Sequence, residues 1–302
     1  MAEMWISMGP QHPMTHGLWT LKVKVDGETI TDADPELGYL HRSVEKMGER
    51  RKYFMNTTLT DRLCYASSTT WTHCYVLTVE ELMNVEIPER AKYVRTIMLE
   101  LQRLASHLMW AGSYMPDLGH ITGALYFWRD RELFLNLLEV PSGSRLLYNY
   151  IRIGGVKRDL PDGFVEKAER VMKLFEQRLD EYSDLFENSK IFRMRTEDVG
   201  KFTAAQAQNL GITGPNMRGC GTKFDLRRND PYEIYEEIDW DIQTRIDNML
   251  KLSNAGAIIA PASPAFYNKP KTLEDNINFI VGRVLDLLGY DSDIFSRWEG
   301  SV

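Results

Sequence analysis

The sequence predicts an α+β fold with three parts: a small N-terminal antiparallel sheet, a helical bundle, and a C-terminal α/β fragment. Three patterns indicate these parts. Apolar residues alternate with polar ones over residues 18–25, recur every three or four positions over residues 88–108 and 162–187, and form a run of small side chains at 255–260.

The N-terminal alternation predicts a β-hairpin. Asp26-Gly27 follows the first extended stretch, and a second one covers residues 29–33. Asp-Gly between two extended stretches is typical of a hairpin with a type I′ turn. The apolar positions of the first stretch are Trp19, Leu21, Val23 and Val25.

Two long amphipathic helices are predicted in the middle of the chain. The first begins at Pro88, which suits the first helical position, and Glu89 suits the positive end of the helix dipole. The second covers about residues 162–187. Each has one apolar face, made of Val94, Ile97, Met98, Leu101, Leu104 and Leu108 in the first and of Val165, Ala168, Met172, Phe175, Leu179, Tyr182 and Phe186 in the second.

The character of the chain changes near residue 248. The apolar run 255–260 predicts a strand, the proline-rich segment 261–270 predicts a loop, and Gly289 ends a helix that carries Ile277, Ile280 and Val284. The sequence therefore predicts two domains, residues 1–247 and 248–302.

Composition excludes several classes of protein. The 302 residues are 43% hydrophobic, which is enough for a packed core, and the net charge of -7 is spread along the chain, so nucleic acid is not an expected partner. No apolar run approaches the roughly 20 residues of a membrane-spanning helix, so any membrane role is expected to be peripheral. Cys64, Cys74 and Cys220 form no C-x-x-C pair, so no metal site is predicted and a neighbouring protein must hold any redox metal.

The segment GPQHPMTHG (residues 9–17) presents two histidines in a loop, because its prolines and glycines exclude a helix. A loop histidine with a pKa of about 6.5 can pair with a carboxylate and deliver a proton to a reduced carbonyl oxygen, as quinone reduction requires. A turn with capping histidines is the alternative for this segment.

Five segments of the chain stand out together. They are GPQHPMTHG (9–17), ELGYLHRSVEK (36–46), DRLCY (61–65), PERAKYVRTIMLELQRLASHL (88–108) and YNYIRIGGVKRDLP (148–161). In this order they resemble the D subunit of complex I-type NADH:quinone oxidoreductases over residues 5–247. This family is similar in fold to the large subunit of [NiFe] hydrogenases, in which two C-x-x-C pairs hold the metal. Neither pair is present, so the resemblance implies a quinone in that place.

The resemblance implies four site residues. His16 and Tyr65 match the family's ligands of the quinone headgroup, and their N–H and O–H groups suit hydrogen bonding and proton transfer to its two carbonyl oxygens. Asp117 matches the carboxylate that orients the histidine. Arg62 matches an arginine near the neighbouring iron–sulfur cluster, which implies an electrostatic role.

Less specific interpretations stay open for several residues. Tyr65 taken alone is expected to be a buried tyrosine with one hydrogen-bonded hydroxyl. The segment RDRE (129–132) suits either a proton relay or ordinary ion pairs. Packing or capping is expected for the remaining histidines, which are His41, His73, His107 and His120.

Residues 248–298 resemble the C-terminal part of flavin prenyltransferases, and Tyr267 and Arg283 match that family's prenyl-phosphate ligands. The phosphate loop that holds FMN in that family has no counterpart here, so FMN binding is not expected. We therefore expect a fusion of two truncated reading frames, with a C-terminal tail of limited order.

The expected function is a quinone-binding subunit of an energy-converting oxidoreductase at the cytoplasmic side of the cell membrane. Electrons are expected from a [4Fe–4S] cluster in a small B-type partner subunit, with a C-type subunit and membrane subunits as further partners. The donor can be NADH, reduced deazaflavin or ferredoxin. The alternatives are an inactive remnant that at most binds the small subunit and, less in keeping with the sequence, a flavin prenyltransferase.

Overall fold

The computed structural model describes residues 4–12, 17–186, 188–197 and 199–238. The chain divides into two compact units, Met1–Leu179 and Asp180–Val302, and the division falls within helix α6. The predicted boundary at residue 247 and the whole predicted C-terminal domain lie outside the described residues.

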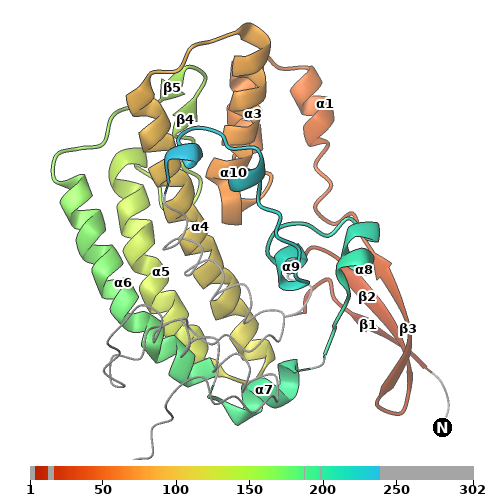
Figure 1. Cartoon of the computed structure of the whole chain (residues 1–302). Coiled ribbons are helices and arrows are strands. Elements are labelled where there is room, and N and C mark those ends of the chain that lie inside the picture. Colours follow the sequence, from red (N-terminus) through yellow and green to blue (C-terminus); the bar gives the residue numbers. More distant parts are fainter. Residues whose placement is uncertain (1–3, 13–16, 187, 198, 239–302) are drawn as a thin grey trace, which may run out of the picture. The chain divides into compact units, whose positions relative to one another are not determined.

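The elements of the chain follow one another as strands, then helices, with one short hairpin among the helices (Figure 1). The strands are β1 (Met4–Met8), β2 (Thr20–Asp26), β3 (Thr29–Glu36), β4 (Ile151–Arg152) and β5 (Gly155–Val156). The α-helices are α1 (Val44–Glu49), α2 (Thr57–Thr60), α3 (Ser68–Met83), α4 (Glu89–Asp117), α5 (Ile121–Ser142), α6 (Phe164–Phe186), α7 (Lys190–Thr196), α8 (Ala204–Asn209), α9 (Gly214–Gly219) and α10 (Leu226–Asn229). The 3-10 helices are η1 (Tyr53–Asn56), η2 (Tyr65–Ser67) and η3 (Tyr235–Glu237).

The N-terminal sheet has three antiparallel strands in the order β1-β2-β3. The predicted hairpin of β2 and β3 is confirmed, and Val23 and Val25 on the central strand are buried as the alternation requires. Strand β1 was not predicted; Met4 pairs with Val25 and Met8 with Leu21. Its sequence MWISM does not alternate clearly, and Trp5 is 53% exposed.

The turn of this hairpin differs from the prediction. Asp26 pairs with Thr29, so Gly27 and Glu28 form a two-residue loop. Gly27 has φ +63°, whereas Glu28 is not among the described residues with positive φ. A type I′ turn needs positive φ at both positions, so type I′ is wrong and the pattern is that of type II′. The side chain of Glu28 explains this, because a Cβ disfavours the left-handed region.

The predicted helix at Pro88 is confirmed as α4, and it is longer than predicted. Pro88 is the N-cap and Glu89 the first helical residue, one position later than expected. Of the expected apolar face, all positions but the half-buried Ile97 are buried, and these are Val94, Met98, Leu101, Leu104 and Leu108.

Helices α4, α5 and α6 lie side by side in Figure 1. Gly112 on α4 allows a close approach of α5, because a Cβ there would lie only 3.0 Å from Nε1 of Trp128. Phe134 on α5 and Phe175 on α6 meet edge to face, with ring centroids 5.0 Å apart. Val165 is 54% exposed, so its predicted inward position is wrong, and its neighbour Phe164 is buried instead.

A buried ion pair joins α3, α4 and the β4–β5 hairpin. Arg95 is 0% and Glu80 is 3% exposed, and two N–H groups of Arg95 donate to the two carboxylate oxygens over 2.5 and 3.0 Å. Arg95 also donates to the carbonyls of Gly155 and Arg152, and the Gly154 N–H donates to Glu80. Since several backbone groups complete this pair, it fixes the ends of three elements together.

The second unit contains short helices with local caps. Thr203 and Gln206 form a capping box at the start of α8. Phe186 packs against Tyr182 and Phe192, with ring centroids 6.3 and 5.8 Å away. No helix among the described residues of either unit has the length and apolarity needed to span a membrane.

Candidate functional site

The segment that carries Arg62 and Tyr65 belongs to the first unit and consists of short turns of helix. Helix α2 ends after four residues, and threonine hydroxyls donate to nearby backbone carbonyls, as Thr60 does to Asn56 over 3.2 Å. Tyr65 then begins η2, directly before α3. Its side chain is 56% exposed, so the expectation of a buried tyrosine is wrong.

The backbone around Tyr65 is held from α4 by one buried amide. Gln102 is 2% exposed, and its Oε1 accepts a hydrogen bond of 2.6 Å from the Thr69 N–H. Its Nε2 donates to Oγ of Ser68 over 3.2 Å and to the Ala66 carbonyl over 3.5 Å. The turn therefore has a fixed backbone, although its tyrosine side chain is exposed to solvent.

Asp61 lies on the other side of this segment and is 0% exposed. Its Oδ1 accepts hydrogen bonds from the Asn149 N–H over 3.2 Å and from Oγ1 of Thr72 over 3.5 Å. Its Oδ2 is buried without a hydrogen-bond partner among the residues of the described ranges. Burial raises the pKa of the Asp61 carboxyl, although the hydrogen bond from Asn149 and the charge of Arg62 act in the opposite direction.

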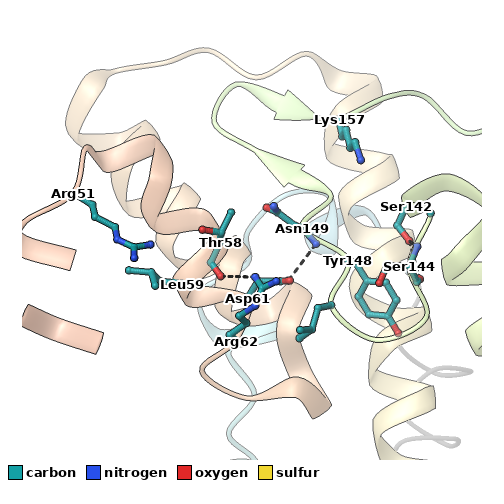
Figure 2. A pocket seen from close by; sticks show the side chains of 12 residues that line it. Arg51, Thr58, Leu59, Asp61, Arg62, Ser142, Ser144, Tyr148, Asn149 and Lys157 are labelled. Carbon is teal, nitrogen blue, oxygen red and sulfur yellow. Dashed lines mark hydrogen bonds between the residues drawn. The ribbon is translucent and has the colours of Figure 1, made fainter. Parts of the chain in front are cut away.

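A polar pocket of about 510 Å³ opens next to Asp61 (Figure 2). Burial raises the pKa of Tyr148 in its wall to about 12. Three cationic side chains, those of Arg51, Arg62 and Lys157, give the pocket a positive rim. The other lining residues are Thr58, Leu59, Asp61, Ser142, Gly143, Ser144, Leu147, Tyr148 and Asn149.

Arg131 on α5 links the pocket wall electrostatically to Tyr65. Burial lowers the pKa of its guanidinium, and the neighbouring phenols of Tyr148 and Tyr65 act in the opposite direction. The guanidinium carbon lies 5.1 Å from the ring centroid of Trp128, a cation–π distance. Tyr65 itself does not line the pocket.

The structure brings together only some of the four residues implied by the family resemblance. Arg62 lines the pocket and donates to the Thr58 carbonyl over 2.9 Å, and Tyr65 follows three residues later. Asp117 is exposed at the end of α4, 15 residues beyond Gln102, which corresponds to about 22 Å of helix. It therefore lies at a different level of α4 from the Tyr65 turn.

His16 and two other predicted site residues lie outside the described residues. The loop that contains His16 joins β1 to β2, and the Gly17 N–H donates to the Pro10 carbonyl over 2.8 Å. The prenyl-phosphate ligands predicted for the C-terminal fragment, Tyr267 and Arg283, also remain predictions.

The expectations for the other histidines are confirmed in part. His73 is 3% exposed within α3, and His107 is half-buried in α4. His120 is the N-cap of α5, where its Nδ1 accepts from the Gly123 N–H over 3.0 Å. His41 is exposed between β3 and α1, whose N-cap is Ser43, so packing or capping is wrong for this residue.

The segment 129–132 forms ion pairs. Asp130 is 0% exposed and accepts hydrogen bonds from Arg129 and from Arg178 on α6. Glu132 pairs with Arg145 near the end of α5. These pairs fit the structural interpretation of this segment, and a proton relay through it stays untested.

Gln102 and Asp61 were missed in the sequence. Gln102 follows Met98 by four positions, so it lies on the apolar face of α4, and a polar residue there signals a buried hydrogen bond. Asp61 gave no comparable signal, because its partners come from residues far away in the chain. Within the described ranges, no cluster of three His, Cys, Asp or Glu side chains has the arrangement of a metal site.

Comparison with known proteins identifies relatives for most of the chain. Residues 117–249 match the family model described as "Respiratory-chain NADH dehydrogenase, 49 Kd subunit". The D subunit of the NADH-quinone oxidoreductase of Geobacillus thermodenitrificans is 44% identical over 243 residues, which are 80% of this chain and 66% of that protein. A D subunit of the same kind of enzyme from Sinorhizobium medicae is 43% identical over 243 residues, 80% of this chain and 60% of that protein.

A solved structure is also similar. It belongs to the membrane-bound sulfane sulfur reductase, an archaeal respiratory membrane complex, with a TM-score of 0.77 and 28% identity over 90% of this chain and 78% of that chain. The chain spans slightly less than two thirds of the curated relatives named above, which are 66% and 60% covered. The aligned part of this chain, with residues 117–249 in it, belongs to the family of the 49 kDa subunit of respiratory-chain NADH dehydrogenase.

Proposed function

We propose that this chain is the quinone-binding subunit of a membrane-associated, energy-converting oxidoreductase. Its relatives are named as D subunits of NADH-quinone oxidoreductases, and the similar solved structure is a respiratory membrane complex. The observation that carries the proposal is the Tyr65 turn, because an exposed phenol on a fixed backbone is suited to hydrogen bonding with a substrate.

In this proposal Tyr65 and His16 bind the two carbonyl oxygens of one quinone. The phenol O–H and an imidazolium N–H donate to these oxygens, and each gives one proton as two electrons arrive, so that quinone becomes quinol. A [4Fe–4S] cluster of the small B-type partner subunit supplies the electrons. Asp117 orients His16 within the assembled complex, and Arg62 adds positive charge on the side of the cluster.

The proposed place of the chain is peripheral, at the cytoplasmic side of the cell membrane. Its partners are the small B-type subunit, a C-type subunit and the membrane subunits. Large apolar side chains that are exposed before α2 support docking to a partner, since such side chains are otherwise buried. They include Leu37 (75%), Leu40 (57%), Tyr53 (48%) and Phe54 (54%).

The test is quinone reduction by a reconstituted complex that contains His16→Ala or Tyr65→Phe, with a decyl-substituted benzoquinone as the probe. Loss of a proton donor is expected to lower the rate by about 10² to 10⁴-fold. Tyr93→Phe is the matched control, because Tyr93 is also an exposed tyrosine and lies on α4, outside both the turn and the apolar docking surface. A double variant that reduces the quinone at the parental rate would refute the site.

A further inference from the structure

Helix α3 has no cap of its own at its N-terminus. The N-cap residue Ser67 has φ -137° and ψ 38° and makes no side-chain capping hydrogen bond. The first N–H groups of a helix have no partner within the helix, and they lie here directly after the Tyr65 turn. Another part of the molecule must therefore complete this helix end.

Gln102 on α4 supplies that partner. Its Oε1 accepts from the N–H of Thr69, the second residue of α3, over 2.6 Å. The other half of the same amide donates to Ser68 and to the carbonyl of Ala66, the residue after Tyr65. A single buried side chain thus holds both the helix end and the turn before it.

The network continues beyond the turn. Oγ of Ser68 donates to the Leu146 carbonyl over 3.1 Å. Gln102 is therefore connected to residues 66–69, which follow Tyr65 directly, and through Ser68 to the chain beyond α5. A buried network of this kind restricts the backbone, whereas an exposed 3-10 turn without tertiary bonds has many conformations.

We infer that Gln102 is a positioning residue for Tyr65: its amide caps α3 from the neighbouring helix and so fixes the turn from which the phenol reaches the substrate. This inference rests on the proposed function. Its physical basis is that a displacement of about 1 Å in a reacting group can lower a rate by about 100-fold, even when the mutated residue does not touch the substrate.

Two variants separate the capping bond from simple packing. Gln102→Leu removes both halves of the amide. Gln102→Glu keeps an oxygen that can accept from the Thr69 N–H, and a carboxylate is favourable at a helix N-terminus, so this variant is expected to restore the cap but not the bonds to Ser68 and Ala66. Thr96→Val is the matched control: Thr96 is also buried on α4, at 3% exposure, and its hydroxyl donates to the Lys92 carbonyl of the same helix.

The first measurement is hydrogen exchange of the full-length chain, which needs no quinone. Gln102→Leu is expected to speed exchange of amides 66–69 by about fivefold, as for the loss of one cap. Thr96→Val should leave these amides at the parental rate, and Gln102→Glu should return the Thr69 amide, which the retained oxygen accepts from, to that rate. Unchanged exchange in Gln102→Leu would refute the cap and the inference with it.

The second measurement is reduction of decyl-substituted benzoquinone by the reconstituted complex. Gln102→Leu is expected to lower kcat/KM by about 10 to 100-fold, and Gln102→Glu should recover most of it. If exchange is faster in Gln102→Leu but its kinetics equal those of Thr96→Val, the cap is purely structural and the positioning role is wrong. A parental complex that reduces no quinone would instead refute the proposed function, and with it the positioning role. The hydrogen-exchange measurement would still show whether Gln102 caps α3.

Discussion

The two ends of α3 use buried polar groups in different ways. At the C-terminal end, Glu80 and Arg95 form a charged pair completed by backbone groups of the β4–β5 hairpin. At the N-terminal end, neutral groups of Gln102 and Ser68 surround a turn whose tyrosine is exposed. One end is therefore an internal ion pair of the fold, whereas the other end fixes the backbone of a turn whose tyrosine side chain is 56% exposed.

The charged end predicts the largest effect on stability. Glu80→Ala leaves the guanidinium of Arg95 buried without its carboxylate, which should lower the free energy of unfolding by about 3–5 kcal/mol. Denaturant titration of the full-length chain measures this. The double variant Glu80→Leu/Arg95→Met should recover most of the loss, because no unpaired charge remains. A change below about 0.5 kcal/mol in Glu80→Ala would contradict the structural role of this end.

Asp130 is a second buried carboxylate, and its substitution separates an effect on stability from an effect on activity. Asp130 pairs with Arg129 and Arg178, so Asp130→Asn should lower the free energy of unfolding by about 1.5–3 kcal/mol, the range for hydrogen bonds to charged groups. Its rate of quinone reduction in the reconstituted complex should stay near the parental rate. A large loss of rate with little loss of stability would favour the proton-relay interpretation of residues 129–132 instead.

The buried carboxyl of Asp61, which accepts a hydrogen bond from Thr72 on α3, predicts a smaller, pH-dependent effect. Burial raises the pKa of Asp61 above its ordinary value of 3.8, so this group stabilises the fold fully below that value, and the contribution is lost as pH rises through the raised pKa. Asp61→Asn does not titrate and keeps an acceptor oxygen. The free energy of unfolding of Asp61→Asn should therefore increase relative to that of the parent as pH rises above the ordinary value of 3.8.

Asp159 provides the control of opposite sign. The hydrogen bond from Arg90 lowers the pKa of Asp159, so its contribution is present above the ordinary value and is lost as pH falls through the lowered pKa. The free energy of unfolding of Asp159→Asn should fall relative to that of the parent as pH rises. The difference should be small, because the pair is exposed. If the free energies of unfolding of Asp61→Asn and the parent differ by an amount that does not change with pH, Asp61 is not a buried carboxyl that titrates.

The sequence predicted correctly those helices and strands in which apolar residues recur at a regular spacing. The hairpin β2–β3 and the apolar face of α4 followed from alternation and from three- and four-residue spacing. Strand β1 was missed because its five residues have no clear alternation and find their partner in β2. The type of the hairpin turn was wrong because Glu28, which follows Asp26-Gly27, decides it.

The site was predictable only in part. Family resemblance singled out Tyr65 and Arg62, whereas Gln102 and Asp61 gain their roles from bonds to residues 33 and 88 positions away. Such contacts leave no periodic trace in the sequence. A polar residue on an apolar helix face marks Gln102 as unusual, but only the folded chain shows what it holds.

The most direct test of the shared quinone site is a double-mutant cycle of His16→Ala and Tyr65→Phe, measured as the rate of quinone reduction by the reconstituted complex. If both side chains act on one quinone ring, the double variant should lose less than the product of the two single losses, with a coupling energy of about 0.5–3 kcal/mol. Single losses that multiply without coupling would contradict the claim that an imidazole and a phenol share one substrate.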